Sequence, residues 1–102
     1  MVIEGPWMRS REPEGPKFSL GSLVATPNAL ITIPQEDLRK ATARHHCGDW
    51  GELEAADKKA NDEALEHGGR LFSAYKSRDG TRFWIITEAD RSVTTVLLPE
   101  DH

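Results

Sequence analysis

The sequence is poor in cysteine, since Cys47 is the only one among 102 residues. A lone cysteine cannot form an internal disulfide, and structural disulfides are rare in compartments where thiols are kept reduced. The composition therefore predicts a cytoplasmic protein that folds without covalent cross-links.

Long apolar runs are also absent from the sequence. None approaches the roughly 18 residues of a membrane-spanning helix, and the first residues lack the apolar core of a signal peptide. Basic residues are fewer than acidic ones, 13 against 17, which gives a net charge of −4. This balance argues against a general binder of nucleic acids or anionic membranes. We expect no membrane contact and no cofactor.

What the sequence does contain is enough for one modest domain. Hydrophobic residues make up 37% of the chain and charged residues 29%, ordinary values for a soluble globular protein. Residues 1–17 stand apart because prolines, glycines and charges dominate them, so little of this segment can be buried. We predict a flexible tail over 1–17, with Trp7 as its candidate for docking, and a single domain over 18–102.

The first half of the predicted domain has the pattern of an edge strand followed by helices. Alternating apolar residues over 18–25 predict the strand. Thr26 and Pro27 are typical of the N-cap and the first position of a helix, which we expect to continue through 28–32. A second helix is expected over 34–48, because acids in its first turn and bases later in it match the helix dipole.

A third helix is predicted because Asp49-Trp50-Gly51-Glu52 matches the pattern of a capping box. In such a motif the Asp49 side chain caps the helix and Glu52 reaches back to the Asp49 backbone. We expect this helix to run from Trp50 to His67 and to end at the two glycines that follow.

The last third of the chain contains three apolar segments, at 70–76, 81–87 and 92–98. Loops at 77–80 and 88–91 are rich in turn residues and predict hairpin connections. The expected fold class is α+β, with two or three N-terminal helices packed on a C-terminal three-stranded antiparallel β-meander.

Side-chain alternation predicts that both faces of this sheet are apolar. The expected register pairs Lys76 with Thr81 and Thr87 with Ser92. One face would then carry Phe72, Ala74, Phe83, Ile85, Val96 and Leu98. The other face would carry Leu71, Tyr75, Trp84, Ile86, Val93 and Leu97.

The helices of so short a chain can cover only one apolar sheet face. A monomer rarely exposes a large apolar patch, and a symmetric dimer is the commonest way to cover one. We therefore expect a homodimer in which tryptophan anchors the contact. The predicted interface residues are Tyr75, Trp84, Ile86 and Val93.

Potential metal ligands lie close together at the predicted end of the second helix. His45, His46 and Cys47 have side chains that bind transition metals. Successive residues of a helix point about 100° apart, however, so such a site needs ligands from elsewhere in the fold. The simpler interpretation is a helix end with His45 packed inward and Cys47 as a structural thiol rather than a nucleophile.

A small enzyme, such as a toxin-like nuclease, is the main alternative function. It would need a cleft that brings together acid, base and cationic side chains. The candidate catalytic residues are His45, Asp49, Glu88 and Arg91. Helix capping explains Asp49 without catalysis, and turn chemistry explains Glu88 and Arg91.

A nucleic-acid-binding module is a second alternative. Basic and aromatic residues interleave over 69–91, as in sheets that stack RNA bases. Phe83 and Trp84 are neighbours on one strand and point to opposite faces, so they cannot form a single stacking platform. We therefore favour protein contacts over nucleic acid.

Five segments carry a resemblance to a known family: residues 24–27, 43–45, 48–51, 84–92 and 95–101. With them, residues 18–102 resemble a small family of uncharacterised bacterial proteins found on plasmids, phages and integrated elements, sometimes labelled plasmid-related. The resemblance implies a mobile-element setting and no established activity. We expect a small non-enzymatic accessory or interaction protein that acts through contacts with an unknown protein partner.

Overall fold

The computed structural model describes residues 16–102. The predicted tail lies outside this range except for Pro16 and Lys17, and so does Trp7. The elements, in chain order, are β1 (Ser22–Ala25), α2 (Pro27–Thr32), α3 (Gln35–His46), α4 (Ala55–His67), β2 (Leu71–Lys76), β3 (Arg82–Thr87), β4 (Val93–Leu97) and the 3-10 helix η2 (Pro99–Asp101).

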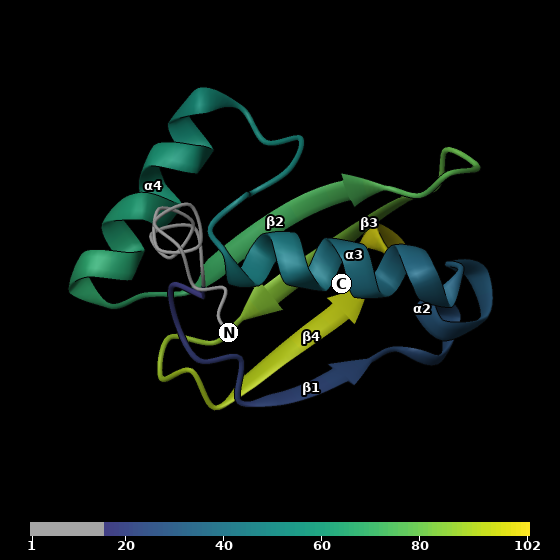
Figure 1. Ribbon diagram of the computed structural model, residues 1–102, viewed down its shortest axis with the longest axis horizontal. Helices are drawn as coiled ribbons and strands as arrows, with labels where there is room; N and C mark the ends of the chain where they lie inside the picture. Colours follow the sequence, from purple (N-terminus) through teal and green to yellow (C-terminus); the bar gives the residue numbers. More distant parts are fainter. Residues whose placement is uncertain (1–15) are drawn as a thin grey trace, which may run out of the picture.

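The sheet has four strands in the order β1-β4-β3-β2 (Figure 1). The predicted α+β class is confirmed, and β2, β3 and β4 form the expected antiparallel meander. The expected three-stranded sheet is wrong, because β1 adds a fourth strand parallel to β4. Alternation within a segment predicts a strand but carries no information on which neighbour the strand pairs with.

The start of α2 follows the sequence prediction. The Thr26 Oγ1 accepts a hydrogen bond from the Ala29 amide at 3.2 Å, and Pro27 takes the first position of the helix. The core lies between the sheet and the helices α2 and α3, with α3 crossing the face of the sheet in Figure 1. Its buried members are Ala29, Ile33, Ala41, Tyr75, Phe83, Ile85, Val96 and Leu98.

The predicted helix start at Trp50 is wrong, because α4 begins at Ala55. Residues 50–52 instead run beside β2, where the Glu52 amide donates to the Ala74 carbonyl at 2.7 Å and the Ala74 amide donates to the Trp50 carbonyl at 3.3 Å. Gly51 has φ +76°, which no right-handed helix contains, and a Cβ there would collide with the Ala74 carbonyl. The open edge of β2 therefore outcompetes the local capping pattern.

The register of β2 and β3 also differs from the prediction by one residue. Lys76 lies opposite Arg82 rather than Thr81. The Ser77 amide donates to the Thr81 carbonyl at 2.9 Å, so the turn closes over residues 78–80 instead of the expected 77–80. A slip of one residue moves every side chain of a strand to the opposite face.

The slip corrects the predicted interface. Tyr75 lies on the helix-covered face with Phe83, is only 2% exposed and donates its hydroxyl to the Asp49 carbonyl. Between β3 and β4, Thr87 lies opposite Thr94 instead of Ser92, a shift of two residues that leaves the faces unchanged. The face opposite the helices is here called the back face, and its apolar side chains are Phe72, Ala74, Trp84, Ile86, Val93 and Leu97.

The back face is less open than the sequence predicts. Ile86 and Leu97 are buried, and Trp84 is half-buried, with the His102 ring edge-on to it at 5.6 Å. Helix α4 lies beside the start of β2 in Figure 1. Among residues 16–102, no helix combines the length and the apolar character needed to cross a membrane.

Candidate interaction site

His45 is a core residue rather than an exposed acid or base. Its ring is 0% exposed, with Nδ1 2.5 Å from the Ser73 Oγ and Nε2 2.9 Å from the Thr87 Oγ1. A serine bonded to an imidazole resembles a nucleophile and its base. Ser73 is itself 0% exposed, however, so the folded chain offers a substrate no access to this pair.

The hydroxyl chain around His45 determines its tautomer. The Thr94 Oγ1 must donate to the Leu20 carbonyl at 2.7 Å, so Thr87 donates its single proton to Thr94 at 2.7 Å. Thr87 can then only accept from His45, so the His45 Nε2 carries a proton and donates a hydrogen bond to the Thr87 Oγ1. The Nδ1 atom accepts a hydrogen bond from Ser73. The imidazole is neutral in this arrangement.

Burial lowers the pKa of His45 from its ordinary 6.5 to about 4, because the charged ring would lose its hydration. Nearby positive charge at His46 and Arg91 acts in the same direction. A neutral, fully bonded imidazole is a structural element of the core, as the helix-end interpretation expects.

The other three candidate catalytic residues serve separate local contacts. The Asp49 carboxylate accepts from the Arg44 Nε at 2.8 Å, and this guanidinium holds the pKa of Asp49 below its usual range. Glu88 pairs with Arg70 at 3.3 Å. In the part of the chain described, no hydrogen bond joins the side chains of any two of the four candidates.

Arg91 binds main-chain carbonyls instead of a carboxylate. Its guanidinium donates to the Gly69 carbonyl at 2.6 Å and to the Ala64 carbonyl at 3.1 Å, and also to Glu88 and Ala89. These bonds tie the end of α4 to the start of β2 and to the β3–β4 turn. The side chain therefore acts as a brace between three segments.

The candidate metal ligands do not converge. His46 packs edge-on against Phe18 at 5.8 Å, whereas His45 is bonded in the core and Cys47 follows the end of α3. Over residues 16–102 there is no group of three or more His, Cys, Asp or Glu side chains arranged to hold a metal ion.

An apolar groove lies between β1 and α3. Its volume is about 550 Å³, within the range of small-molecule ligand pockets. We call it the β1 groove, and it is lined by Leu23, Val24, Ala25, Leu30, Gln35, Leu38, Arg39, Thr42, Ala43, His46 and Val96.

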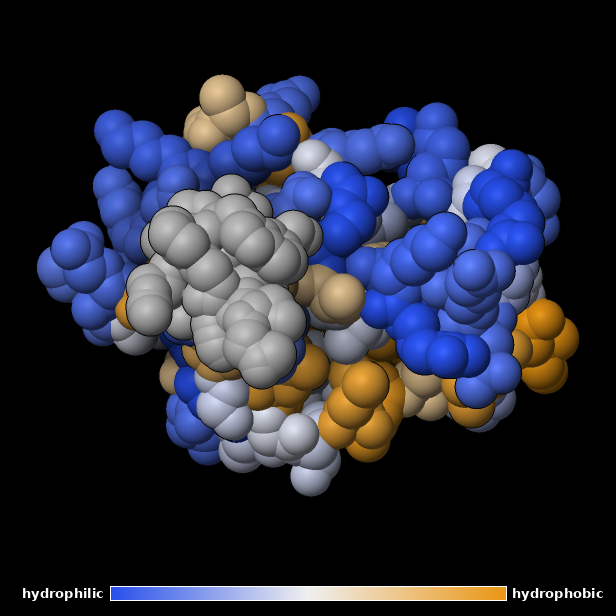
Figure 2. All heavy atoms as spheres, viewed as in Figure 1, coloured by the Kyte–Doolittle hydropathy of each residue, from blue (hydrophilic) through white to orange (hydrophobic). Residues whose placement is uncertain are grey.

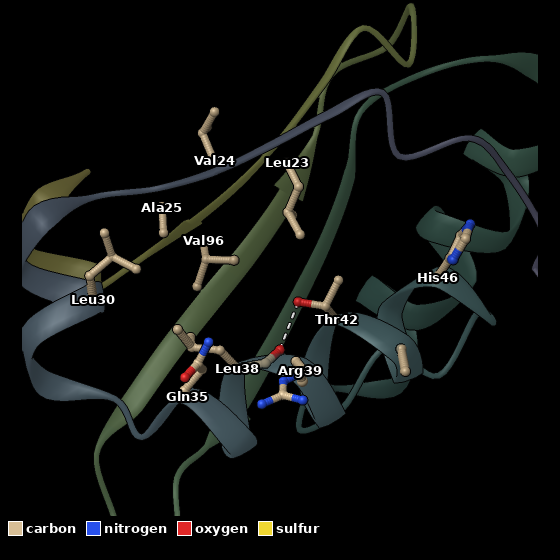
Figure 3. Close-up of a pocket in the computed structure, with 11 residues that line it drawn as sticks. Leu23, Val24, Ala25, Leu30, Gln35, Leu38, Arg39, Thr42, His46 and Val96 are labelled. Carbon is tan, nitrogen blue, oxygen red and sulfur yellow. Dashed lines mark hydrogen bonds between the residues drawn. The ribbon is translucent and has the colours of Figure 1, made fainter.

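The β1 groove exposes large apolar side chains. Leu23 is 52% exposed and Leu30 is 61% exposed, although both are apolar. Figure 2 shows hydrophilic residues over α3 and α4, and hydrophobic residues gathered below α3 and at the outer end of α2. In Figure 3, Leu23 and Ala25 point into the groove and Val24 points away from it.

The outer edge of β1 carries backbone groups that face away from the sheet. The Ser22 amide donates to the Ser92 carbonyl at 3.0 Å, and the Thr26 amide to the Val96 carbonyl at 2.9 Å. Backbone direction alternates along a strand, so the amides and carbonyls of Leu23 and Ala25 point outward.

The opposite edge of the sheet, at β2, is covered. There the Phe72 amide and carbonyl are both bonded by the Asn61 side chain, at 3.1 and 2.6 Å. The Ala74 amide and carbonyl are bonded by residues 50–52. Within residues 16–102, no comparable group bonds the outward backbone of β1, which makes β1 the open edge of the sheet.

Sequence reasoning predicted the edge strand but missed the groove beside it. The signal for the edge strand was the alternation of apolar residues over 18–25. No comparable signal exists for Leu30 and Leu38, because their distance from β1 depends on how the helices pack.

A scan against protein-family models, a search of curated proteins and a search of solved structures each found no match to this chain. The resemblance to the plasmid-related family therefore stays a prediction from the sequence segments.

Proposed function

We propose that this protein is a small non-enzymatic interaction protein that binds an extended polypeptide segment at the β1 groove. The observation that carries the proposal is the outward-facing backbone of Leu23 and Ala25 directly beside an apolar groove. Exposed strand edges bind peptides by strand addition, in which main-chain hydrogen bonds supply affinity and adjacent pockets supply specificity.

The groove also constrains the side chains of the segment that it binds. Alternate residues of an added strand point to the same side, so every second residue would enter the groove. The walls there are Leu30 and Leu38, which favour apolar residues. Arg39 and His46 also line the groove, on its α3 side.

The biological setting is proposed from the sequence resemblance. We place the protein among the cytoplasmic accessory proteins of a bacterial mobile genetic element. The contacts made by His45, Asp49, Glu88 and Arg91 support this over an enzyme, because each side chain is already engaged within the fold.

Selection from a phage-displayed library of random peptides tests the binding activity. We expect the selected peptides to have apolar side chains at alternate positions. Leu30→Asp should weaken their binding by about tenfold or more, as expected for loss of an apolar anchor worth about 1.4 kcal/mol.

Ile31→Asp is the matched control, because Ile31 is the next residue of α2, is 83% exposed and does not line the groove. It should leave peptide binding unchanged. A library that yields no binders to the monomeric chain, or binders that tolerate Leu30→Asp as well as Ile31→Asp, would contradict the proposed function.

A further inference from the structure

We propose that the segment bound at the β1 groove is β1 of a second copy of this chain, paired antiparallel about a two-fold axis at Val24. The inference deepens the strand-addition function proposed above and rests on it. It also gives the homodimer expected from the sequence a different contact surface, the sheet edge instead of the back face.

The backbone of β1 is self-complementary in this register. A two-fold axis at Val24 places Leu23 opposite Ala25 of the second copy, and Ala25 opposite the second Leu23. These are the two residues of β1 whose amides and carbonyls point outward. In antiparallel sheets such a facing pair exchanges both of its main-chain hydrogen bonds. The pairing therefore satisfies the outward groups of both edges.

The side chains of β1 are complementary in the same register. Leu23 and Ala25 point into the groove, so each large Leu23 would lie beside the small Ala25 of the other chain. That position is next to Leu30, whose side chain is exposed in the single chain. On the opposite face of the sheet, Val24 of one copy would lie next to Val24 of the other. This is a favourable cross-strand pair of β-branched residues.

The two edges of the sheet differ in a way that favours a closed dimer. Edge strands are normally protected by charges, prolines or covering segments. The β2 edge is covered by Asn61 and by residues 50–52, whereas β1 contains no charged residue and no proline. Pairing at β1 therefore uses the open edges of both chains and leaves covered edges at the ends of the joined sheet, so assembly stops at two copies.

Cysteine cross-linking at the two-fold axis tests the register directly. In a Cys47→Ser background, Val24→Cys would face its own counterpart across a non-hydrogen-bonded pair. The Cα atoms of such a pair lie about 4.5 Å apart, within the range of a disulfide. We expect most of this variant to form a covalent dimer under mild oxidation at micromolar concentration. The wild-type chain should scatter light as about twice 11.4 kDa.

Ser22→Cys in the same background is the matched control, because it lies on the same strand and the same side as Val24. In the proposed register it faces Thr26 of the other chain. Its own counterpart is displaced by roughly 13 Å, four residues at about 3.3 Å each. It should therefore stay uncross-linked. Equal cross-linking of the two variants would overturn the register and with it the inference.

Two further outcomes separate this inference from the proposed function. A wild-type chain that stays monomeric and still selects peptides dependent on Leu30 would overturn the dimer and leave strand addition standing. A dimer that Trp84→Arg dissociates, and that Val24→Cys fails to cross-link, would place the contact on the back face and overturn the inference.

Discussion

The buried imidazole of His45 should make the free energy of unfolding depend on pH. The pKa of His45 is about 4 in the folded chain, lowered mainly by burial, against an ordinary value of 6.5. Above pH 6.5 the ring is neutral in both states and contributes no pH dependence. Between pH 6.5 and 4 the unfolded chain binds a proton that the folded chain does not. Stability is therefore lost as the pH falls through this window.

The size of the effect follows from the two pKa values. The difference between 6.5 and about 4, at 1.36 kcal/mol per pH unit, corresponds to about 3 kcal/mol once the pH is below both values. Between about pH 7.5 and pH 5 the expected loss is about 2 kcal/mol. That is a large share of the 5–15 kcal/mol that stabilises a typical domain.

Urea denaturation followed by circular dichroism across this pH range measures the loss. His45→Gln should be less stable at pH 7.5, because the amide cannot reach both Ser73 and Thr87, but its stability should change much less with pH. His67→Gln is the control, since His67 is exposed on the last turn of α4, and it should keep the wild-type pH dependence.

Two results would refute this reasoning. One is an equal pH dependence for the wild type and His45→Gln. The other applies even if His45→Gln does not fold: an NMR titration of the wild type in which the His45 ring protonates near pH 6.5. Carboxylates such as Asp49, whose pKa is held down by Arg44, lose their stabilising effect only at lower pH and leave the window above pH 5 clear.

Three further substitutions test local contacts, each with urea denaturation as the measurement. Gly51→Ala should destabilise by more than Gly68→Ala, because both have positive φ but only at Gly51 would the new Cβ meet a main-chain carbonyl. Asn61→Ala should lower the free energy of unfolding by about 2 kcal/mol, because the Phe72 amide and carbonyl lose their hydrogen-bond partner. The exposed Lys59→Ala should be neutral. Thr26→Ala should lose about 1 kcal/mol with the α2 cap, and Thr26→Ser should restore most of it. Equal losses for either matched pair, or no rescue by serine, would contradict these predictions.

The secondary structure that depends on neighbouring residues was predictable from the sequence. Thr26 and Pro27 begin α2 because a hydroxyl cap and a fixed φ act within one turn of the chain. The strands of the meander follow from their own apolar and β-branched residues, and the edge strand before α2 was expected as well. Interactions of this kind need no information from distant segments.

Contacts between distant segments decided the elements that were predicted wrongly. Asp49 and Glu52 match a capping box, but the Ala74 backbone offers residues 50–52 a strand partner, and the helix starts later. The β2–β3 register is the exception, because a local bond between Ser77 and Thr81 closes the loop, and one residue of slip moved Tyr75 from the predicted interface into the core.

The sequence by itself determined an α+β chain with an uncharged edge strand and two apolar sheet faces. Only the tertiary structure decided that β1 pairs in parallel with β4, that Asn61 covers the opposite edge, and that α2 and α3 leave a groove beside Leu23. Strand order, edge cover and the hollow between a helix and a strand depend on segments far apart in the chain. Periodicity within a segment records which residues are buried, and carries no information on what buries them.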